Sequence, residues 1–168
     1  SARLPTRQGA PPLSGSRPPS PKGAAPPGIP ILKAAPLQPA QVDGRLREVF
    51  NAEVGRYPTG RKLLDSMRSP PPMVLEKLDS FDTIAQHSGK GGKEKISLNT
   101  LVLADSVRSL DPGAAQAGDL TDPATLRRYL AAHQELMPRL ARIFDTWYVH
   151  EMTHAAQYRR EGTGAFND

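Results

Sequence analysis

The prolines of this chain are concentrated at its N-terminus, and their distribution limits which part can fold. Eleven of the 18 prolines lie within residues 1–40, together with five basic residues and neither an acidic nor an aromatic one. Proline lacks the backbone N–H that helices and sheets use, and a segment without large apolar side chains cannot offset the entropy lost on ordering. We therefore expect a disordered, Pro-rich basic tail over residues 1–40 and one domain over residues 41–168.

The charge of the chain belongs to this tail. The formal net charge is +5, whereas residues 41–168 hold 17 basic and 17 acidic residues. A sequence pI near 9.7 is typical of nucleic-acid-binding proteins, but those carry their basic residues on a folded face. We therefore expect no nucleic-acid partner. We interpret the tail as an extended solvated linker, with contacts to other proteins as the alternative.

Several other protein classes are excluded by composition. No run of about 18 apolar residues occurs, so we expect neither a membrane span nor a membrane partner. The first residues lack the charged start and apolar stretch of a secretory signal. The chain has no cysteine, which excludes disulfides and thiolate metal sites. These features fit a bacterial protein that is secreted or delivered as an effector, and they fit a cytoplasmic protein equally well.

The spacing of apolar residues predicts two helices at the start of the domain. The first begins near Val42 and ends at Gly55–Pro58, because apolar residues recur on one of its faces. These residues are Leu46, Val49, Phe50 and Val54. A second, short helix is predicted with Thr59 as its cap, and the prolines at 70–72 end it.

The middle of the chain predicts a small sheet. Residues 73–78, 82–87 and 96–98 read as strands, and residues 88–93 read as a mobile hairpin loop because of their glycines. Residues 100–109 fit either a helix or a strand.

Two further helices are predicted toward the C-terminus, which makes the expected class α+β. Asp122 and Pro123 open one of them, as a cap followed by a proline at the first position. Pro138 opens a longer helix that runs to about Arg160 and ends at Gly162–Gly164. Its expected inward residues are Leu140, Phe144, Trp147, Val149 and Met152.

The long helix carries the motif that indicates a chemistry, within the string VHEMTHAAQY at residues 149–158. His150 and His154 lie one helical turn apart on one face, so both imidazoles can reach one metal ion. Glu151 projects about 100° further around the helix, where it can approach a metal-bound water without binding the metal. This is the HExxH pattern, in which Zn²⁺ acidifies a water molecule and the glutamate removes its proton. A structural metal clip and an incidental spacing are the alternatives.

The string VHEMTHAAQY resembles the zincin metallopeptidases, and the gluzincins among them. The resemblance extends more loosely to Thr59–Asp65 and Lys95–Asn99, a layout similar to small zincin-type domains of bacterial effector and toxin proteins. It implies a short sheet over the motif helix, with an edge strand that pairs with an extended substrate. It also implies that His150 and His154 are zinc ligands and that Glu151 is the general base. The chain would then be a zinc metalloendopeptidase with a protein or peptide as its substrate.

A catalytic zinc site needs a third protein ligand, and the motif does not supply it. Metzincins are excluded, because Gln157 and Arg160 stand where that subclass has a glycine and its third histidine. Glu161 returns to nearly the same helix face, but an unbroken helix places it about 10 Å too far along. Asp168 could fold back after the glycine turn. The alternative that we favour is a glutamate on a following helix, as in gluzincins, beyond the end of this chain.

The remaining candidate residues have structural interpretations. His87 precedes the glycine-rich loop and is expected to be solvated, whereas His133 is expected to be a partly buried, hydrogen-bonding histidine. Tyr158 shares the metal-facing side of the helix, and we favour a packing role over contact with an oxyanion. Trp147 and Tyr148 are assigned to the core.

The sequence therefore predicts a monomeric zinc metallopeptidase, in which zinc and Glu151 together activate a water molecule. The alternative is a non-catalytic protein-interaction module with an incomplete or relic zinc site, in which the Pro-rich tail makes the contacts. The sequence does not indicate which peptide bond would be cleaved.

Overall fold

The computed structural model describes residues 36–89 and 93–161 and has the expected α+β class. The predicted tail lies outside the described residues up to position 35, as does the centre of the predicted loop. The elements are η1 (Pro39–Gln41), α2 (Val42–Val54), α3 (Pro58–Asp65), β1 (Met73–Glu76), β2 (Ala85–Ser88), β3 (Lys95–Asn99), α4 (Thr100–Leu110), η3 (Pro112–Gln116), α5 (Pro123–Ala132) and α6 (Leu136–Glu161).

Core packing and regular structure are present a few residues before the expected domain start. Leu37 packs against the core, and Pro39–Gln41 form the 3₁₀ turn η1. The proline at the first position of this turn has the backbone angle that the turn needs, which is why a proline-rich stretch can end in regular structure. The composition of residues 1–40 gave no indication that Leu37 and Pro39–Gln41 belong to the domain.

The local sequence accounts for three of the five described α-helices, α2, α4 and α5. In α2 the predicted face is buried at Leu46, Phe50 and Val54. The Asn99 side chain accepts a hydrogen bond from the Leu101 N–H, and this cap starts α4 as a helix and not as a strand. Asp122 caps α5 as predicted, by accepting from the Thr125 N–H.

The predicted cap of the short helix is wrong. Helix α3 begins at Pro58, and Tyr57 is its N-cap without a side-chain hydrogen bond. Proline already has the helical φ angle and lacks the N–H that a cap would satisfy, so the helix starts one residue before Thr59.

The three strands form one mixed sheet in the order β1–β3–β2. Strand β1 runs parallel to β3, with Leu75 opposite Leu98, and β2 runs antiparallel to β3, with His87 opposite Ile96. One face is apolar and joins the core through Met73, Leu75, Ala85, Ile96 and Leu98. On the other face the Glu76 carboxylate accepts from Lys95 Nζ at 2.8 Å and from the Ser97 hydroxyl.

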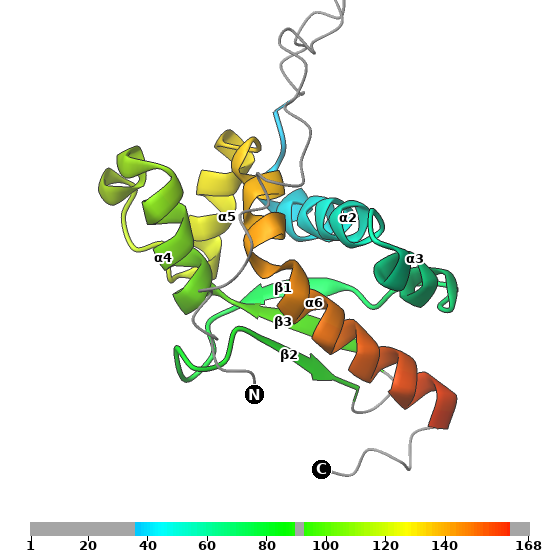
Figure 1. Ribbon diagram of the computed structural model, residues 1–168. Coiled ribbons are helices and arrows are strands. Elements are labelled where there is room, and N and C mark those ends of the chain that lie inside the picture. Colours follow the sequence, from blue (N-terminus) through cyan, green and yellow to red (C-terminus); the bar gives the residue numbers. More distant parts are fainter. Residues whose placement is uncertain (1–35, 90–92, 162–168) are drawn as a thin grey trace, which may run out of the picture.

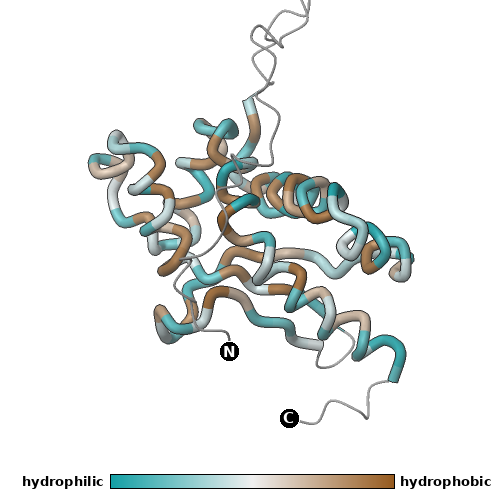
Figure 2. The backbone as a smooth tube through the Cα atoms, viewed as in Figure 1, coloured by the Kyte–Doolittle hydropathy of each residue, from teal (hydrophilic) through white to brown (hydrophobic). Residues whose placement is uncertain are grey.

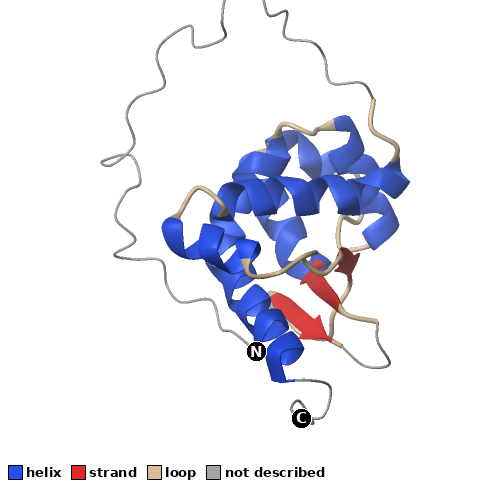
Figure 3. Cartoon of the chain, turned by 90° about the vertical axis from the view of Figure 1, so that its right-hand side faces the viewer, coloured by secondary structure: helices blue, strands red, loops and turns tan. Residues whose placement is uncertain are grey.

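Helix α6 is the longest element and connects the helical layer to the sheet. It runs past α2 and along β2, and the strands gather on one side of the helices (Figures 1 and 3). Its first half is held by Tyr148, which is fully buried, packs edge-on against the Phe50 ring at 5.2 Å, and donates to Asn51 Oδ1. Its last turn is hydrophilic (Figure 2). The fully buried positions of the helix therefore end at Ala155, before its last turn.

The predicted inward residues of α6 are mostly confirmed. Leu140, Phe144 and Met152 are buried, whereas Trp147 and Val149 are half-buried. The helix begins at Leu136, two residues before Pro138, because a proline is accommodated anywhere in the first turn, where no N–H partner is needed. Across residues 36–89 and 93–161, we find no helix with the length and apolar character that a membrane crossing requires.

Candidate metal centre

The two motif histidines point their ring nitrogens at one another. The Nε2 atoms of His150 and His154 lie 3.2 Å apart, and the two rings meet edge to face with centroids at 4.7 Å. Two imidazoles bound to one tetrahedral zinc at 2.0–2.1 Å place their nitrogens about 3.3 Å apart. The His150 side chain is 53% exposed, so the pair is reached from the surface. The arrangement therefore fits two ligands of a single ion.

Glu151 lies beneath this pair, with a side chain that is 8% exposed. Its Oε1 accepts a hydrogen bond from the backbone N–H of His87 at 2.9 Å, and its Oε2 lies 3.9 Å from His150 Nε2. One carboxylate oxygen is thus held by the sheet, and the other faces the imidazoles. Within the motif, the Glu151 side chain is therefore buried, whereas that of His150 is exposed.

The strand that holds Glu151 is the edge strand β2. The Asn99 N–H donates to the Ile84 carbonyl, so in the antiparallel pairing Gln86 and Ser88 direct their backbone groups to β3 and His87 directs its own outward. The outward N–H of His87 binds Glu151, and the carbonyl of Gly89 accepts from the Tyr158 hydroxyl at 2.7 Å. Glu151 and Tyr158 are seven residues apart, which puts them on one face of α6. This face of the motif helix therefore lies along the outer edge of the sheet.

This contact gives Tyr158 a structural role. Its ring also packs edge-on against the His87 ring, with centroids 5.7 Å apart. An ideal Cβ on Gly89 would lie 2.8 Å from Tyr158 Cζ, so the close approach depends on the glycine. The hydroxyl is directed at the sheet, in keeping with the packing role that we favoured.

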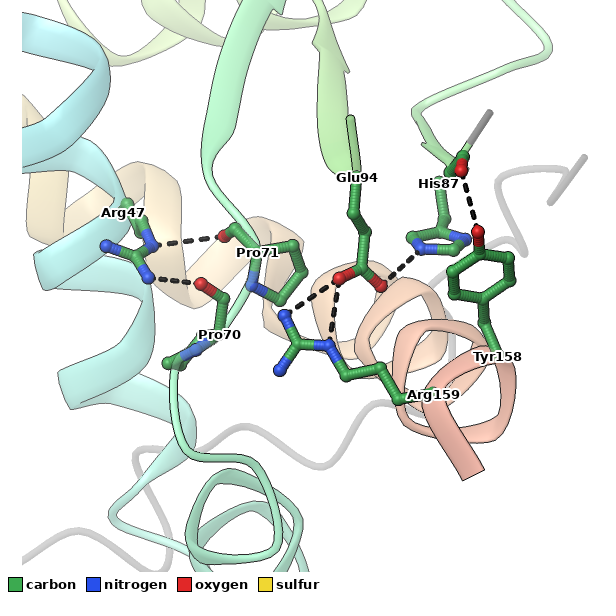
Figure 4. A network of polar contacts seen from close by, with 8 residues as sticks. Arg47, Pro70, Pro71, His87, Glu94, Tyr158 and Arg159 are labelled. Atoms are coloured by element: carbon green, nitrogen blue, oxygen red, sulfur yellow. Dashed lines mark hydrogen bonds and ion pairs between the residues drawn. The ribbon is translucent and has the colours of Figure 1, made fainter. Parts of the chain in front are cut away.

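The expectation of a solvated His87 is wrong. Its side chain is 8% exposed, and its Nε2 lies 2.9 Å from Glu94 Oε2. The other carboxylate oxygen of Glu94 binds the guanidinium of Arg159 through both Nε and Nη2, each at 2.8 Å (Figure 4). The hairpin places Glu94 next to the His87 imidazole, and Tyr158 packs against the ring, so little of the imidazole contacts solvent.

A third metal ligand is not among the described residues. In the part of the chain covered by positions 36–89 and 93–161, no group of three His, Asp or Glu side chains is placed to hold a metal. Helix α6 runs without a break to Glu161, whose carboxylate lies 3.4 Å from the Gln157 side-chain nitrogen. The break that Glu161 would need is therefore not present. Asp168 lies outside the described residues.

The fourth histidine behaves as predicted. His133 is half-buried, its Nδ1 lies 2.9 Å from the Tyr129 carbonyl oxygen, and its ring stacks on that of Tyr129 with centroids at 4.0 Å. The Tyr129 hydroxyl donates to Asp111, and burial together with this hydrogen bond raises the pKa of Tyr129 to about 12. This cluster joins α5 to the end of α4 and has no part in the motif.

Sequence reasoning missed Glu94 and Arg159, which connect the hairpin to the motif helix. Glu94 is the one acidic residue in a lysine- and glycine-rich stretch, directly before a strand. Arg159 is one of two adjacent arginines at the end of the motif helix, and nothing local distinguishes it from Arg160. The only local signal was the single acidic residue, Glu94, beside the lysines, and it did not indicate which residue Glu94 would contact.

Comparison with known proteins identifies no relative of this chain. No protein-family model matches it, and neither a curated protein nor a solved structure does. A function for this chain is therefore inferred from its residues and from the resemblance that its motif carries.

Proposed function

We propose that this protein is a zinc-dependent peptidase that hydrolyses peptide bonds with Glu151 as the general base. The observation that carries the proposal is the arrangement of three side chains on α6. The Nε2 atoms of His150 and His154 lie 3.2 Å apart, and the second oxygen of the anchored Glu151 carboxylate lies 3.9 Å from His150 Nε2. HExxH helices require this combination of two ligands and one base.

Zinc bound at the two imidazoles would supply Lewis acidity, which lowers the pKa of water and polarises a peptide carbonyl. Glu151 would accept the proton of the attacking water on Oε2 and pass it to the leaving amine. Because Oε1 is held by the His87 N–H, the carboxylate keeps one orientation for both transfers. Its low exposure keeps bulk water from competing for the same oxygen.

The substrate would lie beside β2, as the resemblance to zincin-type domains implies. His87 directs both its N–H and its carbonyl away from β3, and the N–H already binds Glu151. Its carbonyl is then the strand's acceptor nearest to the general base. An extended peptide that donates an N–H to it would bring its scissile bond close to Oε2.

The test is zinc binding by the chain, measured by calorimetry on metal-stripped protein. We expect one zinc per chain, no binding in His150→Ala or His154→Ala, and unchanged binding in Glu151→Gln. His133→Ala is the matched control, because this histidine is hydrogen-bonded elsewhere and its loss leaves the motif intact. A folded wild-type protein that binds zinc no more tightly than His154→Ala would contradict the proposal.

Hydrolysis is tested separately with a synthetic peptide library, read by mass spectrometry for new N-termini. We expect cleavage by the zinc-loaded wild-type chain and none by Glu151→Gln. Zinc binding without cleavage of any peptide would favour the alternative function, an interaction module with a relic site.

A further inference from the structure

Glu94 bridges the edge strand and the motif helix. It lies directly before β3, and its two carboxylate oxygens are divided between two elements. One oxygen contacts the His87 imidazole of β2 at 2.9 Å, and the other binds the Arg159 guanidinium of α6 twice at 2.8 Å (Figure 4). Its side chain is 14% exposed, so solvent screens these contacts only in part.

The same strand residue contacts Glu94 with its side chain and the general base with its backbone. His87 gives its imidazole to Glu94 and its N–H to Glu151. A movement of β2 and Glu94 away from α6 would lengthen the bond from the His87 N–H to Glu151 and the pair between Glu94 and Arg159 together. The bond from Tyr158 to Gly89, two residues further along the strand, holds the same spacing from the helix side.

We propose that Glu94 is a positioning residue: by pairing with His87 and Arg159 it fixes β2 against α6 and so keeps the His87 N–H on the Glu151 carboxylate. The catalytic consequence rests on the function proposed above. The positioning itself is a property of the metal-free chain. The positioning role of Glu94 and the proposed function can therefore be refuted independently.

Amide hydrogen exchange, measured by NMR on the metal-free protein, reads the positioning directly. The His87 N–H points out of the sheet and owes its protection to Glu151, whereas the Gln86 N–H is paired within the sheet. In Glu94→Ala we expect the protection of His87 to fall at least tenfold while that of Gln86 stays within twofold. Glu151→Ala gives the reference for complete loss of the bond.

Matched variants distinguish loss of the Glu94 contacts with His87 and Arg159 from a general change of charge or fold. Arg159→Ala is expected to act like Glu94→Ala, and Arg160→Ala, which removes the same charge from the next and exposed residue, is expected to leave His87 protected. Glu94→Gln keeps a carbonyl oxygen that accepts from Arg159 and gains an amide N–H that can donate to an unprotonated His87 Nε2, so it is expected to restore most of the protection. Should Glu94→Ala fail to fold, the two arginine variants carry the test.

The outcomes are distinct. Loss of protection confined to His87 supports the inference. Unchanged protection of His87, or an equal loss at His87 and Gln86, overturns it, because the first denies the link and the second indicates general loosening. The proposed function is tested by zinc binding and peptide cleavage, and its outcome does not depend on the hydrogen-exchange result. Where a library peptide is cleaved, Glu94→Ala is expected to lower kcat about tenfold with KM within twofold, and a change in KM alone would also overturn the inference.

Discussion

Asp43 of α2 and Arg127 of α5 form a two-pronged ion pair across 84 residues of sequence. Arg127 Nε and Nη2 bind the two carboxylate oxygens of Asp43, each at 2.9 Å. The pair also contacts the outer edge of β1, where the Leu75 N–H donates to Asp43 at 3.2 Å and the Leu75 carbonyl accepts from Arg127 at 3.0 Å. Two helices are thereby fixed to the edge of the sheet opposite the motif.

Removing this pair is expected to destabilise the domain. Arg127→Met leaves the Asp43 carboxylate half-buried beside one backbone N–H and leaves the Leu75 carbonyl without its donor. We expect a loss of about 2 kcal/mol in the free energy of unfolding, measured by urea denaturation. Arg128→Met is the matched control, because Arg128 is exposed and donates to the exposed Thr125 hydroxyl, and it should change stability by less than about 0.5 kcal/mol. Equal effects of the two substitutions would contradict the role of the pair.

Glu76 is expected to make stability depend on pH. Hydrogen bonds from Lys95 and Ser97 lower the pKa of its carboxyl from the ordinary 4.5. The ionised form therefore stabilises the fold above the unfolded-state pKa, and this contribution is lost as the pH falls through the lower folded-state pKa. Because the side chain is 35% exposed, the effect is small, below about 1 kcal/mol.

The measurement is urea denaturation of wild type and Glu76→Gln at several pH values. The wild type should be more stable at pH 7, and the gap should narrow steadily below about pH 4.5. Glu48→Gln, at a carboxyl whose side chain is 74% exposed, provides the control and should show a smaller gap. A gap that widens toward acid would show that the sign is wrong.

Under the proposed function, substitution of Glu151 should separate metal binding from hydrolysis. Glu151→Gln keeps the side-chain shape and an acceptor for the His87 N–H but removes the base, so we expect cleavage to fall more than about a hundredfold with zinc retained. His150→Ala should lose zinc and cleavage together. Peptide cleavage that persists in purified Glu151→Gln would rule out this mechanism.

Gly89 should tolerate a methyl group only when Tyr158 is small. In Gly89→Ala the new Cβ would lie 2.8 Å from the ring, which must then move off its bond to the Gly89 carbonyl. We expect a loss of about 1–2 kcal/mol in stability. The same substitution in Tyr158→Ala should cost clearly less, and thermal unfolding of the four proteins in the cycle measures this coupling. Additive effects would mean that the ring moves freely.

The sequence predicted the elements better than it predicted their contacts. The apolar face of α2, the Asp122 cap and the inward residues of α6 were all local signals, in which spacing or one side chain decides the outcome. The cap of α3 was wrong because Pro58, one residue earlier, already satisfies the conditions for a helix start. Such errors are confined to element ends.

The site was only partly visible for a different reason. The positions of His150, Glu151 and His154 on one helix follow from helical geometry alone. The His87 N–H that holds the glutamate comes from a strand 64 residues away, and Glu94 meets Arg159 across 65 residues. No local pattern specifies which side chain of one element faces which group of another. For the same reason His87 was assigned to solvent.

Both edges of this sheet already have bonding partners among the described residues. On β1, the Leu75 N–H and carbonyl are hydrogen-bonded to Asp43 and Arg127. Beside β2, the His87 N–H and the Gly89 carbonyl are hydrogen-bonded to side chains of the motif helix. A peptide that adds itself as a fourth strand at β2 could donate to the His87 carbonyl, but it would have to displace α6 from the His87 N–H and the Gly89 carbonyl, so its backbone would gain less than that of a fully paired strand. Discrimination between substrates would then fall to their side chains, so cleavage sites should share residue types more than they share an extended conformation.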